Sequence, residues 1–456
     1  MAGESPFRRL DDFGAVMKSG VANFRGPRVR AHSKTERDNA VSEPLPSHML
    51  AARLHGVGFE NLHVERVPVP QPNDDQLLAR VDAAGVCASN LKLIAQGSDH
   101  TFLNGWDLAR YPIQLGDEGC VTVVAVGKNL SNRFEIGRRY CIQPAVDHPP
   151  INHRERYRNN GEGMSKVAVG YTLPGHLAQY LLVSEEIIAA GCLLPVTDSG
   201  MPYFAAALAE PISCAISAQD RHLHIQQSGP DAPREPKLGL LRGGVTMVIG
   251  AGPMGRMHAE AALRYRPRHL IVVDLMQSRL QWIEEALPAR ARAVGCELHA
   301  VVSEQAVDLL HRVSKGRGAD DIIVAVASRA VQTQAQQWLA KGGVLNLFGG
   351  LKKGDHVIDL DTLRVHYDEI RICGSSGGSP ADIAETLRMA AARELDVGRH
   401  MSMVGSLDQI GRALEMVRNT ETDGKIVLYP HLRHTPLEQA RNWTLGDEQT
   451  FVKCHA

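Results

Sequence analysis

The chain has 456 residues, which at about 150 residues per domain predicts two or three domains. It carries 50 Lys and Arg against 51 Asp and Glu, and this balance excludes a field of one sign that would attract nucleic acid or an anionic membrane. Its eight cysteines form no C-x-x-C pair, which argues against a disulfide scaffold and favours a reducing cytoplasm. No run of about 18 apolar residues indicates a membrane-spanning helix.

The first 47 residues differ from the rest of the chain in their pattern of apolar and charged residues. Apolar residues recur there every three or four positions, which predicts an amphipathic helix with a stripe of Phe7, Leu10, Phe13, Met17, Val21 and Phe24. A charged, proline-containing stretch without periodicity follows and indicates a linker. We expect residues 1–47 to form an arm that packs on its own chain or on a sister subunit, or a helix that docks to a larger assembly.

Short β-branched runs punctuated by glycine predict a strand-rich domain over residues 48–215. Residues 216–378 alternate between apolar strands and amphipathic helices, which predicts a doubly wound α/β domain with six parallel strands. Helices are expected from Met254, Gln277, Glu304, Ala330 and Pro380. The chain then returns to the first domain over residues 379–430 and ends in a tail, 431–456.

A dinucleotide site is predicted where the motif GAGPMG follows the strand VTMVI and opens a helix. Gly250 permits the turn, Gly252 lets the backbone approach a pyrophosphate, and Gly255 lets the helix pack on the strand. Asp274 ends the next strand, where a carboxylate accepts hydrogen bonds from the adenosine ribose and repels a 2′-phosphate, so NAD is favoured over NADP. The predicted cofactor-binding residues are Gly250, Gly252, Pro253, Met254, Gly255, Asp274 and Arg279.

Three segments carry chemistry ahead of the glycine motif: Gly85 to Asn90 (GVCASN), Gly116 to Gly119 (GDEG), and Glu210-Pro211. Together they resemble the zinc-type medium-chain alcohol and polyol dehydrogenases. The details GSDH, GCLLP, LAEPISC and GSSGGS are most similar to the L-sorbose-1-phosphate reductase group. The resemblance implies a GroES-like catalytic domain joined to a Rossmann domain.

The resemblance also implies a single catalytic zinc. Cys87 matches the family's cysteine ligand, Glu210 its acidic ligand, and Glu118 the glutamate beside the metal, while Asp117 stands where the family has histidine. Thiolate with two carboxylates makes a more negative ligand set, which suits a harder cation, although Cys87 still favours zinc. We expect the Asn90 amide to donate a hydrogen bond to Asp117, either beside a remodelled metal site or in a site without metal.

The family's proton relay implies a path from the substrate oxygen through Ser89 and the cofactor ribose to Lys92. Lys92 has two other interpretations, a partner for an acidic group or substrate phosphate and a plain solvated lysine. The segment from Val146 to Val167 contains no cysteine, so no structural zinc is expected.

The sequence therefore predicts an NAD(H)-dependent oxidoreductase that interconverts a secondary alcohol and a ketone on a sugar, polyol or polyol phosphate. Ser89, Lys92 and Glu118 are its predicted catalytic residues, and Cys87, Asp117, Glu118 and Glu210 its metal ligands. Two alternatives remain, a metal-free oxidoreductase and a non-catalytic NAD-binding scaffold that acts through its N-terminal helix. A homodimer or homotetramer without nucleic-acid or membrane partners is expected.

Overall fold

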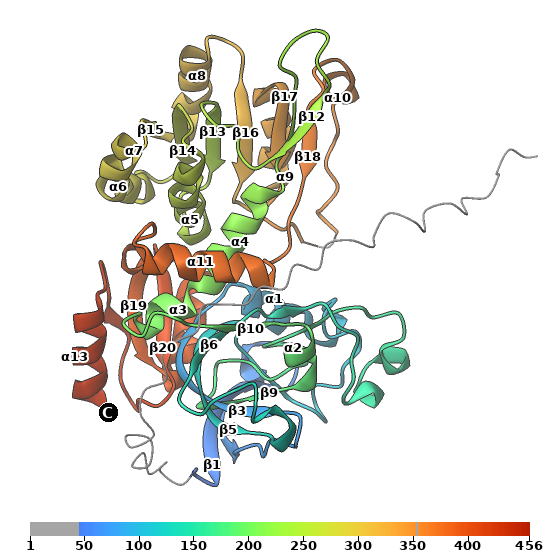
Figure 1. Ribbon diagram of the computed structural model, residues 1–456, viewed down its shortest axis with the longest axis vertical. Coiled ribbons are helices and arrows are strands. Elements are labelled where there is room, and N and C mark those ends of the chain that lie inside the picture. The colour runs from blue at the N-terminus through green and yellow to red at the C-terminus, as the bar shows by residue number, and fades with distance from the viewer. Residues whose placement is uncertain (1–44, 353) are drawn as a thin grey trace, which may run out of the picture. The chain divides into compact units, whose positions relative to one another are not determined.

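Six parallel strands form the sheet of the nucleotide-binding part of the chain (Figure 1). The strands in spatial order are β15 (Glu297–Val302), β14 (His269–Asp274), β13 (Val245–Ile249), β16 (Ala319–Val324), β17 (Leu339–Asn346) and β18 (Arg371–Cys373). From β13 the chain adds β14 and β15 toward one edge of the sheet, and then β16, β17 and β18 toward the other edge. This order is that of a Rossmann fold, and the prediction of a doubly wound sheet with six strands is confirmed.

Helices cover both faces of this sheet because successive strand residues point to opposite sides. Val248 of β13 packs in one cluster with residues of α5, α6 and α7, while its neighbour Met247 packs in another with residues of α8 and α9. These helices are α5 (Pro253–Ala262), α6 (Gln277–Ala286), α7 (Pro288–Ala293), α8 (Ser303–Ser314) and α9 (Arg329–Ala335). Helices α5, α6, α8 and α9 start within one residue of the predicted positions, whereas α7 was not predicted.

A second, largely antiparallel sheet forms the core of the catalytic part. Its strands in spatial order are β10 (Leu193–Pro195), β6 (Arg139–Ile142), β5 (Glu118–Val126), β3 (Leu77–Gly85), β20 (Lys425–Tyr429), β19 (Met401–Ser406) and β21 (Glu438–Gln439), with β9 (Tyr180–Val183) also paired to β3. Strands β19 and β20, which follow the nucleotide-binding part in the chain, thus complete a sheet that begins with β3. The predicted combination of a strand-rich domain with a doubly wound domain is confirmed.

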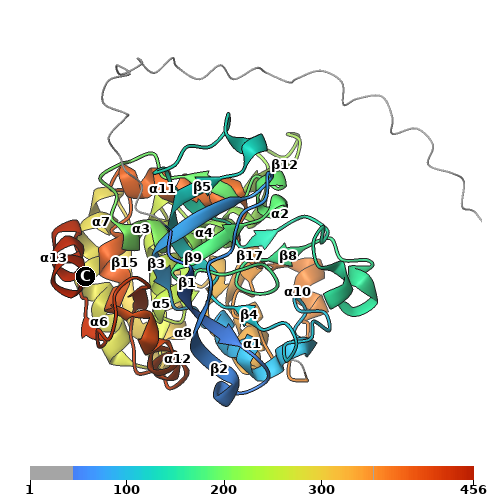
Figure 2. The same ribbon diagram turned by 90° about the horizontal axis from the view of Figure 1, so that it is seen from below.

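The remaining elements are short. Small sheets contain β1 (His48–Leu54), β2 (Leu62–Pro68) and β4 (Ile113–Gln114), the hairpin of β11 (Leu223–Gln226) and β12 (Glu235–Leu238), and the pair β7 (Ala145–Val146) and β8 (Val167–Ala168). The other helices are α1 (Ser89–Gln96), α2 (Glu185–Ala189), α3 (Tyr203–Ala207), α4 (Ala209–Asp220), α10 (Thr362–Tyr367), α11 (Pro380–Ala391), α12 (Ile410–Arg418) and α13 (Leu445–His455). The chain crosses between its two parts through α4 and α11, which pack on one another (Figures 1 and 2).

The C-terminal segment is anchored by Glu448 of α13. This buried carboxylate accepts hydrogen bonds from the backbone N–H groups of Tyr203 and Phe204, at 2.8 and 2.9 Å, and from the Tyr429 hydroxyl at 2.9 Å. A carboxylate at the free N–H groups of a helix N-terminus is stabilising. Residues 431–456 therefore pack on the catalytic part and cap α3.

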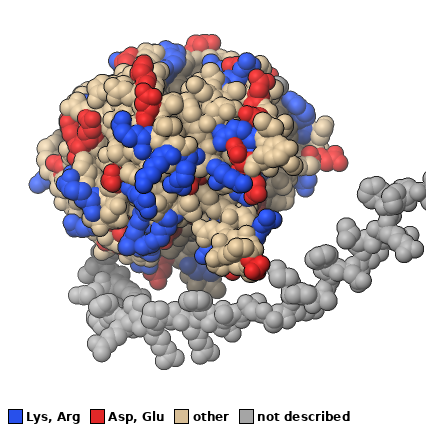
Figure 3. All heavy atoms as spheres, turned by 90° about the horizontal axis from the view of Figure 1, so that it is seen from above, with Lys and Arg blue, Asp and Glu red and all other residues tan. Residues whose placement is uncertain are grey.

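The structure describes residues 45–352 and 354–456, so the predicted helix between Phe7 and Phe24 and the linker up to residue 44 lie outside the described residues. No helix within the described residues is long and apolar enough to cross a membrane. The face above the parallel sheet carries Asp and Glu as well as Lys and Arg, with a group of basic side chains near its centre (Figure 3).

Candidate active site

Three strands of the catalytic sheet meet where the predicted site residues lie. Gly85, the last residue of β3, pairs with Glu118 at the start of β5 and with Val427 of β20. Cys87 lies two residues after the end of β3, and Asp117 directly precedes β5. The Cys87 thiol therefore lies within electrostatic range of both Asp117 and Glu118.

Glu118 forms a buried ion pair with Lys425. The Lys425 Nζ lies 2.5 Å from Glu118 Oε1 and also donates to the backbone oxygen of Val86 at 3.2 Å. Burial opposes the charge on Lys425, but Glu118 and Cys87 outweigh it and raise the Lys425 pKa. A Cβ on Gly85 would lie 2.1 Å from Glu118 Oε2, so only glycine leaves room for this carboxylate.

Sequence reasoning missed Lys425. Its partner lies 307 residues away, and no motif joins the two. The available signal was a lysine at the start of the otherwise apolar strand of GKIVLYP, because a buried lysine needs a charged partner.

Asp117 is held by Ser89 and not by Asn90. The Ser89 hydroxyl donates to Asp117 Oδ2 at 2.5 Å, whereas the Asn90 amide donates to the backbone oxygen of Cys87 at 3.1 Å. The predicted hydrogen bond from Asn90 to Asp117 is therefore wrong, because the Asn90 side chain turns back onto the carbonyl three residues before it. The other carboxylate oxygen, Oδ1 of Asp117, is buried without a hydrogen-bond partner among the described residues.

Tyr171 is a second residue that sequence reasoning missed. Its side chain is buried next to Ser89. Burial, with the nearby charges of Asp117 and Cys87, raises the Tyr171 pKa well above its ordinary value, so it stays a proton donor at neutral pH.

Glu210 approaches from the first turn of α4. Its side chain is buried, and the Cys214 thiol one turn later donates to Glu210 Oε1 at 3.3 Å. Burial, followed by the charges of Glu118 and Asp117, raises the Glu210 pKa well above its ordinary value. Burial, followed by Asp117 and Glu118, likewise raises the Cys87 pKa.

This donor set fits a divalent cation. A thiol and three carboxylates share the site with one lysine, and two carboxylate oxygens, Asp117 Oδ1 and Glu118 Oε2, are buried without hydrogen-bond partners in the described part of the chain. Buried anions need a cation or a hydrogen bond, and a metal would also reverse the pKa shifts of Cys87 and Glu210. Two clusters of three ligand atoms within 4.8 Å of one another occur among the described residues, and neither includes Cys87, Asp117 or Glu210. The ligand assignment therefore stays a prediction.

The glycine motif lies at the carboxyl end of β13, and α5 begins within it. Gly252 is the N-cap of α5, and Pro253 and Met254 form its first turn. A Cβ on Gly255 would lie 1.7 Å from the backbone oxygen of Gly250, so the turn requires glycine there. The free N–H groups of the helix N-terminus thus face the carboxyl edge of the sheet, where a pyrophosphate binds in this fold.

Asp274 lies at the end of the neighbouring strand and is buried. Its Oδ2 accepts the backbone N–H of Ala251 at 2.7 Å, and its Oδ1 accepts that of Met276 at 2.9 Å. The Arg279 guanidinium lies 3.8 Å from Asp274 Oδ2, with Nη1 3.9 Å from the point that a Cβ on Gly252 would occupy. The structure therefore brings Asp274 and Arg279 to the glycine turn.

Lys92 lies on α1 and is exposed. Its Nζ is 3.2 Å from the point that a Cβ on Gly350 would occupy, in the loop after β17. Lys92 thus extends from the catalytic part to the carboxyl edge of the parallel sheet, on the same α1 helix as Ser89.

Two family models match the chain in the order of its two parts. An alcohol dehydrogenase GroES-like domain matches residues 73–193, and a zinc-binding dehydrogenase domain matches residues 243–392. Among curated proteins, the chain is 31% identical to the protein YggP of Escherichia coli over 77% of this chain and 80% of that protein. It is 29% identical to an L-sorbose 1-phosphate reductase of Klebsiella pneumoniae, over 79% of this chain and 83% of the reductase.

A solved structure confirms the arrangement of the fold. A putative zinc-binding dehydrogenase from Sinorhizobium meliloti, bound to NADP, superposes with a TM-score of 0.65 at 21% identity, over 84% of this chain and 100% of that one. The two domain matches, the 31% identity to YggP and this superposition all agree. The chain is therefore a member of the zinc-type medium-chain alcohol and polyol dehydrogenase family.

Proposed function

We propose that the protein is an NAD(H)-dependent oxidoreductase that interconverts a secondary alcohol and a ketone on a sugar, polyol or polyol phosphate. The observation that carries this proposal is the buried cluster of Cys87, Asp117, Glu118 and Glu210, two of whose carboxylate oxygens have no hydrogen-bond partner in the described residues. A carbohydrate substrate is supported by the relative that is named an L-sorbose 1-phosphate reductase.

Cys87, Asp117 and Glu210 would hold a catalytic zinc, with Glu118 beside it. When bound, the metal would polarise the substrate oxygen. Asp117 Oδ1 is the oxygen available to a metal, because Oδ2 is engaged by Ser89. Lys425 offsets the Glu118 charge, so that three anionic side chains are left to face a divalent cation.

Ser89 and Lys92 would carry the proton between the substrate oxygen and solvent. The Ser89 hydroxyl is fixed by its bond to Asp117, which orients it before substrate arrives. Lys92 extends to Gly350 at the nucleotide edge, where the cofactor ribose would lie between it and Ser89. The support for this relay is the placement of these two side chains on one helix, α1.

The cofactor would lie along Gly250, Gly252 and Gly255, with its adenosine ribose at Asp274. The Asp274 carboxylate repels a 2′-phosphate, and this favours NAD(H). Arg279, paired with that carboxylate at 3.8 Å, would contact the adenosine end of the cofactor.

The test is NADH oxidation with a panel of ketoses, ketose phosphates and inosose-like ketones. Turnover of at least one ketone, abolished by chelation, supports the proposal. Turnover that survives EDTA with no bound metal favours the metal-free oxidoreductase. Tight NADH binding without turnover on any ketone favours the scaffold.

We also propose that the enzyme is a cytoplasmic homo-oligomer, a dimer or a tetramer. The edge of the parallel sheet at β18 is flanked by α10, where Leu363 and Tyr367 are each 67% exposed, and such apolar side chains favour association. All eight cysteines are free, as expected in a reducing compartment. Light scattering on the full chain measures the subunit number.

A further inference from the structure

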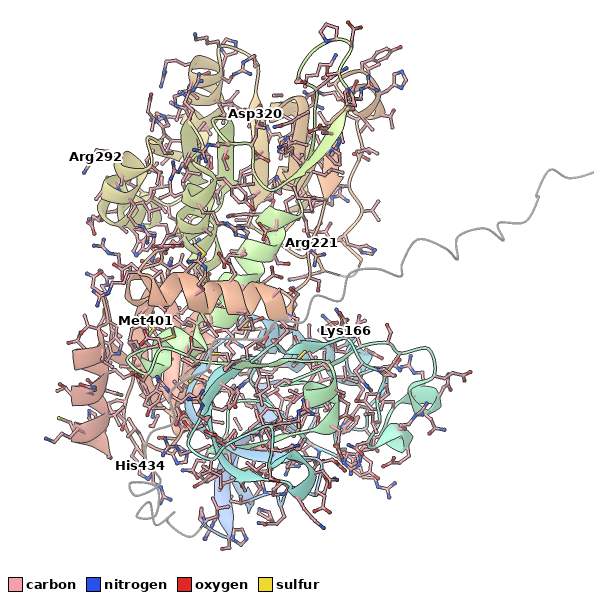
Figure 4. All side chains as sticks on the ribbon, viewed as in Figure 1. Lys166, Arg221, Arg292, Asp320, Met401 and His434 are labelled. Atoms are coloured by element: carbon pink, nitrogen blue, oxygen red, sulfur yellow. The ribbon has the colours of Figure 1, made fainter. Side chains whose placement is uncertain are left out.

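A cluster of two histidines and a glutamate lies at the amino ends of β14 and β15, away from the nucleotide edge. His269 begins β14 and is the cross-strand neighbour of Glu297, the first residue of β15. His299 lies two residues after Glu297 and so points to the same face of the sheet. In Figure 4, Arg292 marks α7, the helix before β15, and Asp320 marks the amino end of β16 in the same sheet.

Two of the three separations between the ligand atoms match those of ligands around a metal. His269 Nδ1 lies 3.3 Å from His299 Nε2 and 3.5 Å from Glu297 Oε2, and all three atoms lie within 4.8 Å of one another. The Nδ1 atom carries at most one proton, so it can donate to only one of its two neighbours. Ligands about 2.0–2.1 Å from a tetrahedral zinc lie about 3.3–3.4 Å apart, whereas most N–H···O hydrogen bonds are about 2.7–3.2 Å long.

We propose that His269, Glu297 and His299 bind a divalent transition metal, with zinc as the fitting ion. Two imidazoles and one carboxylate select Zn²⁺, Co²⁺, Ni²⁺ or Cu²⁺ over Mg²⁺ and Ca²⁺. The metal would join β15, the edge strand, to β14 at the end of the sheet opposite Asp274. This site is separate from the proposed catalytic site and does not depend on it.

A second cluster shows why spacing decides between a metal and a hydrogen-bond network. His222 Nδ1 and His224 Nε2 lie 2.7 and 2.8 Å from the same oxygen of Asp321, and the backbone N–H of Leu241 donates to the other oxygen at 2.7 Å. These are ordinary hydrogen-bond lengths, and three donors satisfy one buried carboxylate. The Asp321 carboxylate is thus satisfied without a metal, although His222 Nε2 is buried without a hydrogen-bond partner among the described residues.

The surroundings of the proposed site suit a metal that exchanges with solvent. The side chain of His269 is 11% exposed and that of Glu297 is 69% exposed. The site is therefore buried on the His269 side and open to solvent on the Glu297 side. Water can occupy the fourth position.

The test strips the full chain with chelator, adds excess zinc, removes the unbound zinc by dialysis and counts the zinc that stays bound. We expect the double variant His269→Gln/His299→Gln to bind one equivalent fewer than the wild type by elemental analysis. The matched control is His55→Gln/His63→Gln, a pair of histidines beside Glu65 whose ring centroids are 5.4 Å apart and which does not form a ligand cluster. The control should keep the full count. Equal counts in the wild type and the His269 variant, or an equal loss in the control, would overturn the proposal.

A spectroscopic measurement isolates this site from the catalytic one. In a Cys87→Ser background, which removes the only thiol among the proposed ligands, Co²⁺ should give visible d–d bands without thiolate charge transfer. Adding His269→Gln/His299→Gln should abolish these bands, and Glu297→Gln should raise the Co²⁺ concentration needed for half-saturation by at least about 10-fold. Zinc should raise the melting temperature of the Cys87→Ser protein and leave that of the triple variant unchanged. Bands or a thermal shift that persist in the triple variant contradict the assignment.

Discussion

Lys425 and Glu118, 307 residues apart in the chain, form a buried ion pair with 2.5 Å between Nζ and Oε1. The pair joins β20, near the end of the chain, to β5 of the first catalytic segment. It thereby links β20, which joins the catalytic sheet after the nucleotide-binding part of the chain, to Glu118 beside the proposed metal.

Lys425→Met is expected to destabilise the protein by about 3–5 kcal/mol, because it leaves the Glu118 carboxylate buried and unpaired. Urea unfolding measures the change. The double variant Glu118→Gln/Lys425→Met removes both charges and should recover most of the loss. A single variant as stable as the wild type would show that the pair does not carry this role.

Ser89→Ala is expected to lower kcat by about 100-fold or more, which is the usual contribution of positioned proton transfer. The hydroxyl is held 2.5 Å from Asp117, so the substitution removes the group that is proposed to lie next to the substrate oxygen. Ser89→Thr keeps the hydroxyl and should retain most activity. Steady-state kinetics with the best ketone of the panel compares the two, and equal kcat for Ala and Thr would rule out the proton role.

Asp274→Ser is expected to shift the cofactor preference toward NADPH. The substitution removes the charge that repels a 2′-phosphate and releases the Arg279 Nη1 from Asp274, so that it can pair with the phosphate. The measurement is the ratio of kcat/KM for NADH and NADPH, which should change by at least about 10-fold, equal to 1.4 kcal/mol. Asp423→Ser is the matched control, because Asp423 also lies 3.8 Å from Arg279 but on the catalytic part. A larger shift in the control than in Asp274→Ser would contradict the assignment of Asp274 to the ribose.

His258→Leu is expected to flatten the dependence of stability on pH. Burial, followed by the charge of His222, lowers the pKa of His258 to about 3, and neither ring nitrogen has a hydrogen-bond partner in the described residues. The unfolded chain binds a proton at this histidine below about pH 6.5, whereas the folded protein does not until about pH 3. His258 therefore contributes stability above pH 6.5 that is lost as the pH falls, about 2 kcal/mol between pH 7 and pH 5.

Urea unfolding at pH 7 and pH 5 compares the wild type with His258→Leu. The exposed His434 supplies the control, because His434→Leu should keep the wild-type slope. An unchanged slope in His258→Leu would show that this histidine is protonated alike in both states.

The fold was predictable from local pattern. Apolar runs followed by glycine and amphipathic helices indicate buried parallel strands, and the doubly wound order follows from short right-handed connections. The glycine turn was equally clear, because Gly250 and Gly255 have backbone roles that no other residue can fill.

The site residues were predictable only where they belong to a recognisable sequence motif. Cys87, Glu118 and Glu210 lie in recognisable segments, but the partner of Glu118 depends on which distant strand completes the sheet. Asp117 accepts a hydrogen bond from Ser89 and not from Asn90. This choice depends on the side-chain directions in the first turn of α1, which the sequence spacing does not specify. The cluster of His269, Glu297 and His299 required the register of β14 against β15, which no local signal sets.

The most direct test of the account is the metal content of protein purified without chelator, measured together with NADH-dependent ketone reduction. We predict stoichiometric zinc or another divalent metal that is lost in Glu210→Gln and Cys87→Ser, together with activity that falls in proportion to the metal removed by EDTA. The His269→Gln/His299→Gln background keeps the second proposed site out of the count. Full activity in protein that holds no metal at Cys87, Asp117 and Glu210 would contradict the account.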